Sequence, residues 1–404
     1  MKQIINHFTD NDLYTFTCMY YILQKYPRAE TEYCFFDRNH TCYPKGFDSL
    51  VREQLEHLRN VVITDEEREF MTRSFPFLPY WFINVFLRGF RFNPDELTIS
   101  QDEEGHLDIR VKGKWWSTII WEMPILATIS ELMHILNGDT MKYNAESEWE
   151  KSLLKGHQIW ENGLTLGDMG TRRRFSFDHQ ERVIDALIQS YAEVYQKTDG
   201  RCGKFTGTSN VYFAMKKNIP CLGTMSHQII SFEEIVSGVV ECNYNVMNKW
   251  SEVYDGNVGI FLYDCFGDRV FFNNMSKRMA MTFCGLRIDS GVEEEQVDMI
   301  VKKYKQLGIA PTTKQAVFSN GLDIDRAVQI HRYCEGKITD SYGIGTFLTC
   351  DVTDCKPMNI VVKLVRGRIT ESREWHPCVK LSCDKGKTLG DTQKCEYLLS
   401  ILND

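Results

Sequence analysis

The sequence predicts an α/β protein, and two patterns support this fold class. From about Pro124 onward, short apolar strands recur roughly every 30 residues with amphipathic helices between them, and this spacing implies right-handed parallel crossovers. Such a segment folds either as an α/β barrel or as a doubly wound sheet. Before Ile125 and after Cys350 the pattern is that of helices and hairpin strands. The end of the chain is therefore expected to rejoin its N-terminal part.

The individual elements follow from hydrophobic periodicity. Val183, Ile184, Leu187 and Ile188 lie on the apolar face of a predicted helix over residues 181–196. Further helices are predicted over residues 47–58, 232–254, 292–307 and Ile324–Cys334, and strands over residues 107–111, 258–262, 281–286 and 315–319. A short segment at 341–348 precedes a predicted hairpin formed by residues 359–365 and 379–382.

The domain boundaries rest on these changes of pattern, because no Gly/Ser- or Pro-rich linker interrupts the chain. We expect an N-terminal α/β domain over residues 1–125 and a strand–helix domain with the active site over residues 126–352. A C-terminal segment, residues 353–404, is expected to return to the N-terminal domain. The length of 404 residues is compatible with this organisation.

Composition and charge restrict the class of partner. Lysine and arginine number 47 against 55 aspartate and glutamate residues, a net charge of −8 that excludes a nucleic-acid-coating surface but not local anion sites. The chain start lacks a signal-peptide pattern, and the two most apolar stretches, residues 75–90 and Trp115–Leu136, contain prolines and charged residues. Fourteen cysteines without a C-x-x-C pair are typical of reduced thiols. We expect a soluble cytoplasmic protein that binds small molecules, with no nucleic acid and no membrane.

Glycine-bearing polar clusters follow the predicted strands at residues 287–291 (RIDSG), 319–323 (SNGLD) and 343–346 (GIGT). Loops at the carboxyl ends of parallel strands build the active site of an α/β barrel. Glycines there let backbone N–H groups approach an anion. Each cluster alone also fits a tight turn, but three in succession favour phosphate binding. Neither a P-loop nor a full dinucleotide-binding fingerprint is present.

A run of three arginines occupies residues 172–174, within GTRRRF. It is either a solvated face or a site that captures a carboxylate or phosphate, because a guanidinium pairs bidentately with such groups. The flanking threonine and phenylalanine favour a small aromatic acid as the ligand.

His227 stands out among the histidines because it follows a Gly-Thr turn (GTMSH, residues 223–227) and opens a predicted helix. A neutral imidazole there is a competent nucleophile toward phosphorus, and the helix N-terminus favours negative charge. Glu233 and Glu234 are candidates for orienting it, and the sequence does not choose between them.

Ordered motifs across the chain resemble the nicotinate phosphoribosyltransferase family. They are TDNDLY at residues 9–14, WEMPIL at 121–126, GTRRRFSFDHQ at 170–180, GTSNVYFA at 207–214, GTMSH, RIDSG, FSNGLD, GIGT and the tail KLSCDKGKT at 380–388. The resemblance runs from about residue 9 to 390, nearly the whole chain. Val292 and Asn320 depart from it, since relatives often carry acidic residues there.

The resemblance implies an irregular α/β barrel, similar to a TIM barrel, with an N-terminal α/β domain, and usually a homodimer. It implies formation of nicotinate mononucleotide and diphosphate from nicotinate and 5-phosphoribosyl diphosphate, the first step of NAD salvage from nicotinate. ATP hydrolysis through a phosphohistidine at His227 and an expected Mg²⁺ ion are also implied. Tyr14 falls where an aromatic residue of the neighbouring subunit reaches the pyridine ring.

The resulting site prediction has three groups. The catalytic residues are His227, Arg287 and Asp289; the pyridine-binding residues are Tyr14, Arg172, Arg173, Ser209 and Thr224; the phosphoribosyl-diphosphate-binding residues are Ser319, Gly321, Asp323, Gly343, Gly345 and Thr346. The metal ligands stay open. Asp264, Asp289 and Asp323 are candidates for ribose or metal–diphosphate contacts, with helix capping as the alternative.

Several other functions compete with this assignment. Within the enzyme class, the arginine run argues against nicotinamide, and the Gly-Thr-x-x-His element argues against a quinolinate enzyme. A non-catalytic pyridine-nucleotide sensor and an unrelated phosphosugar enzyme are the remaining alternatives. The C-terminal cysteines Cys350, Cys355, Cys378, Cys383 and Cys395 could form a zinc site, but their spacing favours buried thiols.

Overall fold

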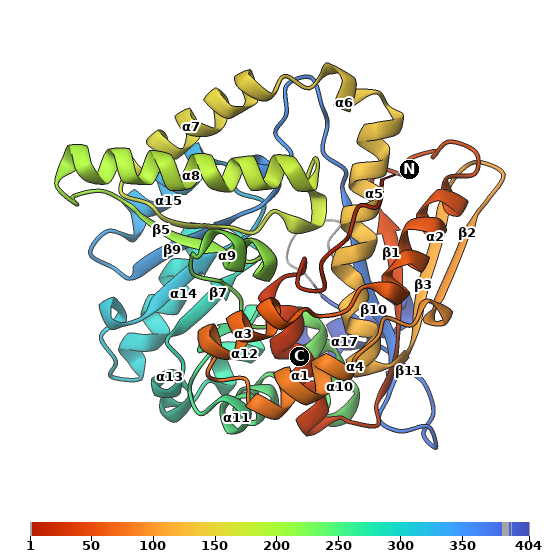
Figure 1. Ribbon diagram of the computed structural model, residues 1–404. Coiled ribbons are helices and arrows are strands. Elements are labelled where there is room, and N and C mark those ends of the chain that lie inside the picture. Colours follow the sequence, from red (N-terminus) through yellow and green to blue (C-terminus); the bar gives the residue numbers. More distant parts are fainter. Residues whose placement is uncertain (1, 382–387, 389, 404) are drawn as a thin grey trace.

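The computed structural model describes residues 2–381, 388 and 390–403. Its strands form two sheets, one of five antiparallel strands and one of six parallel strands. Figure 1 shows the antiparallel sheet on the right of the view and the parallel strands on the left.

The parallel sheet confirms the predicted irregular barrel. Its strands are β4 (Thr165–Asp168), β5 (Lys204–Thr208), β6 (Ile260–Leu262), β7 (Gly285–Ile288), β8 (Gln315–Phe318) and β9 (Thr339–Ile344), in the order β5-β4-β9-β8-β7-β6. The last strand, β9, pairs in parallel with the first, β4, so the sheet curls back on itself. The barrel is interrupted between β5 and β6, and the chain that connects these strands forms α9 (Val211–Lys217), α10 (His227–Ser237) and α11 (Cys242–Tyr254).

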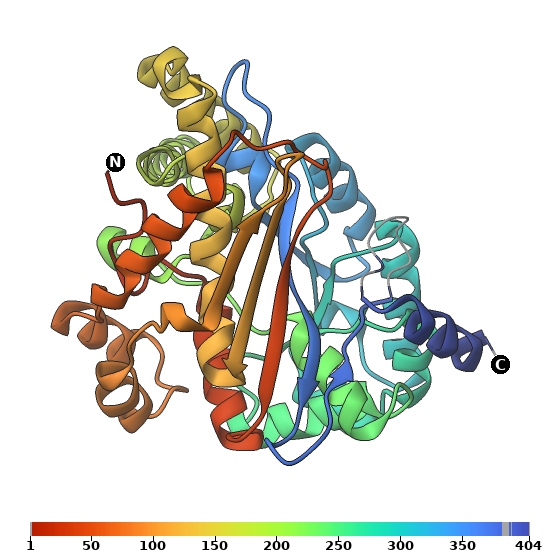
Figure 2. The same cartoon turned by 90° about the vertical axis from the view of Figure 1, so that its right-hand side faces the viewer.

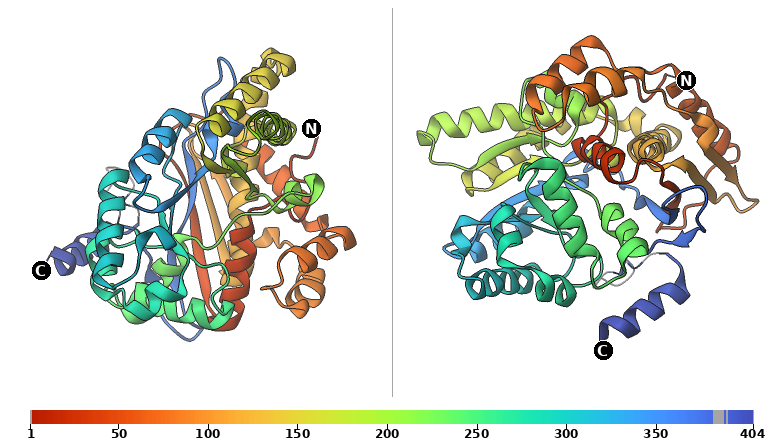
Figure 3. Two further views of the ribbon diagram at one scale, coloured as in Figure 1. Left: turned by 90° about the vertical axis from the view of Figure 1, so that its left-hand side faces the viewer. Right: turned by 90° about the horizontal axis from the view of Figure 1, so that it is seen from below.

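Helices cover the outside of the barrel (Figure 3). They include α7 (Ala145–Glu161), α8 (Phe177–Thr198), α14 (Glu293–Gln306) and α15 (Ile324–Cys334). Local chemistry sets where several of them begin. Asn144, Ser176 and Asp323 cap α7, α8 and α15 by accepting hydrogen bonds from first-turn backbone N–H groups.

The antiparallel sheet has the order β11-β10-β1-β3-β2. Its strands are β1 (Glu30–Asp37), β2 (Leu97–Gln101), β3 (Leu107–Lys114), β10 (Ile360–Arg368) and β11 (His376–Pro377). β10 pairs with β1 along its whole length, so the C-terminal segment does complete the N-terminal sheet. Figure 2 shows the blue β10 beside the red β1.

A continuous helical stretch, Trp115–Leu136, is long and apolar enough to cross a membrane, but 89% of its most apolar window is buried inside the protein. It includes α5 (Glu122–Leu136), which packs against α2 (Phe47–His57) and β10. This burial makes it a core element, as its interrupted sequence predicts.

The remaining helices connect or flank these layers. They are α1 (Leu13–Lys25), α3 (Asp65–Ser74), α4 (Trp115–Thr118), α6 (Asp139–Lys142), α12 (Asp268–Asn274), α13 (Lys277–Thr282), α16 (Thr346–Thr349) and α17 (Thr392–Asn403), with 3₁₀ turns at Leu58–Asn60, Pro94–Glu96, Ile119–Trp121, Thr171–Arg173 and Pro311–Thr313 and a π-helical turn at Phe82–Leu87. Helix α17 projects from the body of the molecule (Figure 2).

Three predicted elements are wrong in extent. Residues 232–254 form two helices, because Gly238 adopts a φ of +81° and ends α10. Residues 281–282 belong to α13, whose N-cap Ser276 starts a helix before the strand β7. Residues 379–381 do not pair with β10; the chain instead crosses to the barrel, where the Leu381 N–H donates to the Cys265 carbonyl at 3.0 Å. Ser382 lies outside the described residues.

Candidate active site

A cavity of about 560 Å³ lies between the barrel and the antiparallel sheet. The barrel contributes residues at the carboxyl ends of five strands: Met169 after β4, Ser209 after β5, Asp289 after β7, Ser319 after β8 and Gly345 after β9. The opposite wall includes Lys363 on β10. Polar residues from separate loops therefore converge at one edge of the barrel, as expected for parallel strands.

All the predicted site residues except Thr224 and Asp323 line this cavity. The lining residues are Tyr14, Arg172, Arg173, Ser209, His227, Arg287, Asp289, Ser319, Gly321, Gly343, Gly345 and Thr346. The sequence motifs, spread over more than half of the chain, are thus brought to a single place.

The two exceptions have structural roles. Asp323 caps α15, its Oδ1 accepting from the Arg326 N–H at 2.7 Å, as the capping alternative expects, and its contact with the diphosphate stays a prediction. Thr224 stands between the lining residues Gly223 and Met225, and its carbonyl accepts from Thr17 Oγ1 at 2.5 Å. This contact fixes the turn that precedes His227.

His227 begins α10 and is buried at the base of the cavity. Its Nε2 lies 2.9 Å from Asp264 Oδ1, 2.8 Å from Lys380 Nζ and 3.7 Å from Asp289 Oδ2. Ser290 Oγ donates to the other oxygen of Asp264 at 2.7 Å. Asp264, which follows β6, is therefore the acid that orients His227.

Glu233 and Glu234 do not orient His227, although they lie on the same helix. Glu233 accepts hydrogen bonds from Tyr26 and from Lys249, and Glu234 pairs with Lys394. Both carboxylates therefore point away from the imidazole, toward the elements packed behind α10.

The charges around His227 fix its protonation state. Burial, reinforced by the Lys380 ammonium, lowers the pKa of His227 to about 4, so the imidazole is neutral near pH 7. Burial alone would raise the pKa of Asp264, but interaction with the His227 ring, including its hydrogen bond, and the Lys380 ammonium hold it well below its usual value. The site therefore combines a neutral imidazole, a carboxylate and an ammonium within hydrogen-bonding distance.

Cationic side chains dominate the cavity. Arg38, Arg172, Arg173, Arg287, Lys363 and Lys380 line it against the acidic Asp12, Glu122 and Asp289. Burial, together with the neighbouring guanidinium groups of Arg172 and Arg38, lowers the pKa of Arg173 to about 10. The buried Nε atoms of Arg38 and Arg287 have no hydrogen-bond partner among the described residues. In a chain of net charge −8, such a concentration of positive charge is a site for polyanions.

The three consecutive arginines divide between two roles. Arg174 is fully buried and pairs with Asp10 and Glu131 at 2.7 Å each, so it is a structural residue. Arg172 reaches to 3.7 Å from Glu122 with a partly exposed side chain. Arg173 is held by its Nε donating to the Ile360 carbonyl at 2.9 Å. Only Arg172 and Arg173 are available to a ligand.

Tyr14 lies in the cavity of its own chain, where its hydroxyl donates to Glu122 Oε2 at 2.9 Å. Ser209 donates to Asp12 Oδ1 at 2.8 Å. These residues, with Arg172, line one region of the cavity with an aromatic ring, hydroxyl groups and a guanidinium.

Sequence reasoning missed five charged residues of the cavity. Asp12, Glu122 and Lys380 stand inside the motifs TDNDLY, WEMPIL and KLSCDKGKT, so those motifs held the signal. Arg38 and Lys363 belong to no motif and enter the cavity only because β1 and β10 pair. Residues 382–387 of the tail motif lie outside the described residues.

A resident Mg²⁺ ion does not fit the acidic group at this cavity. His227, Asp264 and Asp289 are close enough to share a cation, but the Lys380 ammonium already lies 3.4 Å from Asp264 and 3.8 Å from Asp289. A neutral imidazole is also a poor ligand for this hard ion.

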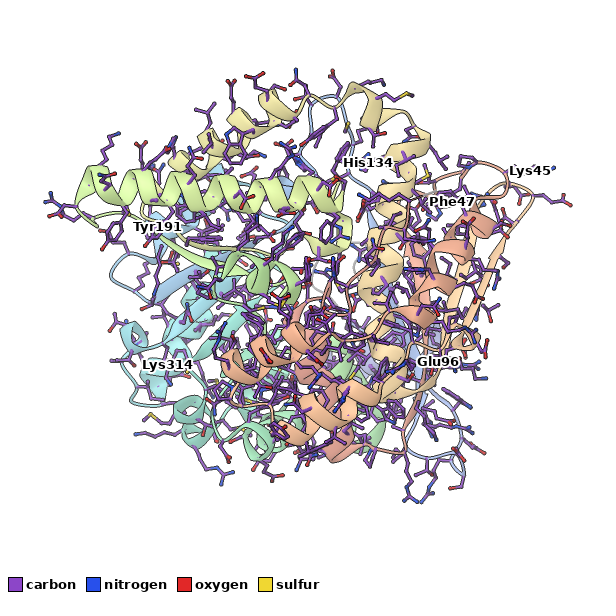
Figure 4. All side chains as sticks on the ribbon, in the orientation of Figure 1. Lys45, Phe47, Glu96, His134, Tyr191 and Lys314 are labelled. Carbon is purple, nitrogen blue, oxygen red and sulfur yellow. The ribbon has the colours of Figure 1, made fainter. Side chains whose placement is uncertain are left out.

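Within the described part of the chain, the C-terminal cysteines do not all lie together. Cys355 lies near His134 and Asp139, and Cys350 Sγ lies 3.3 Å from His134 Nε2. Cys378 and Cys395 belong to neither group. Cys383 is outside the described residues. His134, labelled in Figure 4, lies near the end of α5, where Asp139 Oδ2 binds its Nδ1 at 2.8 Å.

Comparison with known proteins gives a consistent result. A model of the nicotinate phosphoribosyltransferase (NAPRTase) family matches residues 164–402, and a model of its N-terminal domain matches residues 9–130. Nicotinate phosphoribosyltransferase of Desulforapulum autotrophicum is 37% identical over 399 residues, with 99% of each chain covered. That of Methanosarcina mazei is 35% identical, with 96% of each chain covered.

Comparison with solved structures leads to the same family of proteins. The crystal structure of nicotinate phosphoribosyltransferase from Porphyromonas gingivalis superimposes with a TM-score of 0.93 at 38% identity, covering 99% of this chain and all of the other. The structure from Vibrio cholerae gives a TM-score of 0.87 at 27% identity, covering 99% of this chain and 94% of the other. The two family models cover both sheets and most of the cavity lining, and the chain therefore belongs to the nicotinate phosphoribosyltransferase family.

Proposed function

We propose that this chain joins nicotinate to 5-phosphoribosyl diphosphate, forming nicotinate mononucleotide and diphosphate. The observation that carries the proposal is the cationic cavity at the barrel edge, with a neutral, acid-oriented histidine at its base. The family assignment agrees with it, since the relatives described above carry this activity as their name.

The reaction replaces the bond from C1 of the ribose to the diphosphate oxygen by a bond from C1 to the pyridine nitrogen. The diphosphate leaves with the electron pair, so the protein must hold negative charge that develops on it. Gly321, Gly343 and Gly345 present backbone to the cavity at the ends of β8 and β9. We infer that they and the cavity arginines bind the phosphates of the donor.

The pyridine carboxylate needs a cationic partner in the cavity. Arg172 has its guanidinium beside Tyr14 and Glu122, so we place the aromatic acid there, with Tyr14 against the ring. A guanidinium pairs bidentately with a carboxylate but not with a neutral amide. This difference favours nicotinate over nicotinamide.

His227 is the proposed acceptor of the ATP γ-phosphoryl group. The lone pair of its unprotonated ring nitrogen forms an N–P bond, the P–O bond to ADP breaks, and ADP leaves with that electron pair. Asp264 stabilises the positive charge that the ring acquires. A phosphoryl group on His227 lies at the same cavity as the donor site, so its charge can be coupled to donor binding.

Mg²⁺ is expected to enter with the substrates, since the acidic cluster around His227 does not suit a resident ion. Mg²⁺ is commonly bound through substrate phosphates and retained waters. When bound there it neutralises charge on the diphosphate. We also propose a homodimer acting in the cytoplasm; the free thiols of the described cysteines support a reducing compartment.

Product analysis tests the proposal. Purified protein is incubated with nicotinate, 5-phosphoribosyl diphosphate and Mg²⁺, with and without ATP, and compared with His227→Ala. We expect nicotinate mononucleotide, ATP stimulation and acid-labile labelling by [γ-³²P]ATP in the wild type, and neither stimulation nor label in the variant. Product formed from nicotinamide or quinolinate, with none formed from nicotinate, would overturn the substrate assignment. Binding of nicotinate with no product from any pyridine would instead indicate a sensor.

A further inference from the structure

The Nε2 atom of His227 lies within hydrogen-bonding distance of two groups with opposite requirements. Asp264 Oδ1, at 2.9 Å, is a carboxylate oxygen that can only accept. Lys380 Nζ, at 2.8 Å, is an ammonium nitrogen that can only donate. A ring nitrogen of neutral imidazole carries either a proton or a lone pair, so Nε2 can bond one of these partners at a time.

The two choices have different chemical consequences. When Lys380 donates to Nε2, the ring proton sits on Nδ1, and neither nitrogen has a free lone pair. When Nε2–H donates to Asp264, the lone pair of Nδ1 is free to attack. Within the described residues, the hydrogen bonds of this ring all involve Nε2. The position of the Lys380 ammonium therefore decides whether His227 is a nucleophile.

Lys380 is placed to respond to an anion. It comes from the C-terminal segment, where Leu381 anchors the chain to Cys265 of the barrel, and its side chain lines the same cavity as the phosphate-binding glycine loops. Its other anionic partners among the described residues are farther away, at 3.4 Å from Asp264 Oδ2 and 3.8 Å from Asp289 Oδ2. A phosphate in the cavity offers the ammonium stronger, shorter hydrogen bonds than these carboxylates do.

We propose that Lys380 is a positioning residue that couples the arrival of a phosphate anion to the nucleophilic tautomer of His227. The inference rests on the proposed function, in which His227 accepts the γ-phosphoryl group. The ammonium turns to the phosphate oxygens, Nε2 takes a proton from water as Nδ1 releases its own, and Nε2–H donates to Asp264. The Nδ1 lone pair then forms the N–P bond as the P–O bond to ADP breaks, and the electron pair leaves with ADP.

The tautomer of His227 can be measured directly. The full-length protein is labelled with [¹⁵N]histidine, and the His227 signals are assigned by their loss in His227→Gln. We expect the Nδ1–H tautomer in the ligand-free wild type and the Nε2–H tautomer after addition of the non-hydrolysable β,γ-imido analogue of ATP. Lys380→Met should show the Nε2–H tautomer without any ligand. Lys363→Met removes a cavity lysine that makes no hydrogen bond or ion pair with His227 within the described structure, and it should behave as the wild type.

The same tautomer in ligand-free wild type and Lys380→Met would overturn the proposal. Asp264→Ala gives a second test that does not require the lysine variant to fold: without the competing acceptor, Lys380 should hold the ligand-free ring in the Nδ1–H form, and the Nε2–H form in that ligand-free variant would also overturn the proposal. The test is separable from the proposed function, because it needs no turnover. A wild type that switches tautomer but makes no nicotinate mononucleotide would refute the substrate and leave the role of Lys380 standing.

Kinetics provide an independent measurement. Loss of the Lys380 ammonium removes one charged hydrogen bond to phosphate, so Lys380→Met should raise the KM for ATP about 10- to 100-fold. Because its His227 is already in the reactive tautomer, the single-turnover rate of phosphorylation at saturating ATP should stay within about threefold of the wild-type rate. This corresponds to a difference below about 1 kcal/mol in the activation free energy. A large fall in that rate with an unchanged KM would contradict the proposed coupling.

Discussion

Arg174 and Asp10 form two parallel hydrogen bonds, at 2.7 and 2.8 Å, and neither side chain is exposed to solvent. Arg174 also donates to Glu131 of α5 at 2.7 Å. One guanidinium therefore joins three segments: the N-terminal loop before α1, helix α5 and the loop after β4. Two carboxylates depend on this single cation for their burial.

Arg174→Met is accordingly expected to lower the free energy of unfolding by about 3–5 kcal/mol, because it leaves Asp10 and Glu131 buried without a cation. Urea unfolding followed by circular dichroism measures the change. Arg172→Met, two residues earlier in the chain and facing the cavity, serves as the matched control and should change stability by less than about 1 kcal/mol. Equal stability of the two variants would contradict the structural role of Arg174.

The arginine run also shows how far the sequence carries the site. Three adjacent arginines have the same local signal, so their own sequence does not divide their roles, and only the resemblance singled out Arg172 and Arg173 for the ligand. The partner that buries Arg174 stands 164 residues away, and only tertiary packing brings it near. Lys380 and His227 are separated by 153 positions, so their contact also has no local signal in the sequence.

Elements with strong local signals were predicted well. Helix α15 has the predicted bounds, because Asp323 caps its first turn and apolar residues repeat with helical period. The parallel crossovers left a barrel and a doubly wound sheet open, and only the resemblance favoured the barrel, because the pairing of β9 with β4 is long-range. The C-terminal crossing at Leu381 was missed for the same reason, since its partner is a backbone carbonyl of the barrel.

Arg172→Met should raise the KM for nicotinate about 10- to 100-fold, because a charged hydrogen bond to the carboxylate is worth roughly 1.5–3 kcal/mol. The folded structure should be preserved, since this side chain is partly exposed in the cavity. Steady-state kinetics at saturating 5-phosphoribosyl diphosphate give the value. An unchanged KM for nicotinate, with a raised KM for the donor, would assign Arg172 to the diphosphate instead.

His227 should make the protein sensitive to acid. Its pKa is about 4 in the folded state and about 6.5 in an unfolded chain, so the unfolded state binds the additional proton first. The free energy of unfolding should therefore fall as the pH is lowered from about 6.5 toward about 4, by up to about 1.4 kcal/mol per pH unit. The contribution of this group is constant above that range.

Urea unfolding of the wild type and His227→Gln across this pH range isolates the effect. His179, whose pKa burial also lowers to about 4, is present in both proteins and cancels in the difference. We expect the free energy of unfolding of the wild type, relative to that of His227→Gln, to fall as the pH is lowered from about 6.5 toward about 4. Parallel stability curves would show that His227 binds its proton equally in the folded and unfolded states.

Gly321 lines the cavity after β8 with a φ of +59°, and a Cβ atom there would meet no neighbouring atom within 4 Å. An alanine would therefore be strained by backbone conformation alone, at a cost of about 1–2 kcal/mol. Relief of that strain would turn the backbone N–H groups away from the donor phosphates. Gly321→Ala is expected to raise the KM for 5-phosphoribosyl diphosphate severalfold.

Gly336 offers a matched control, because it has a φ of +71°, has equally open surroundings and lies outside the cavity lining. Gly336→Ala should lose a similar amount of stability while leaving the KM for the donor unchanged. If both variants lose stability alike and neither changes that KM, the loop after β8 does not bind the phosphates. If Gly321→Ala alone raises it, the positive φ at this position serves the binding site, since strain by itself is common to both glycines.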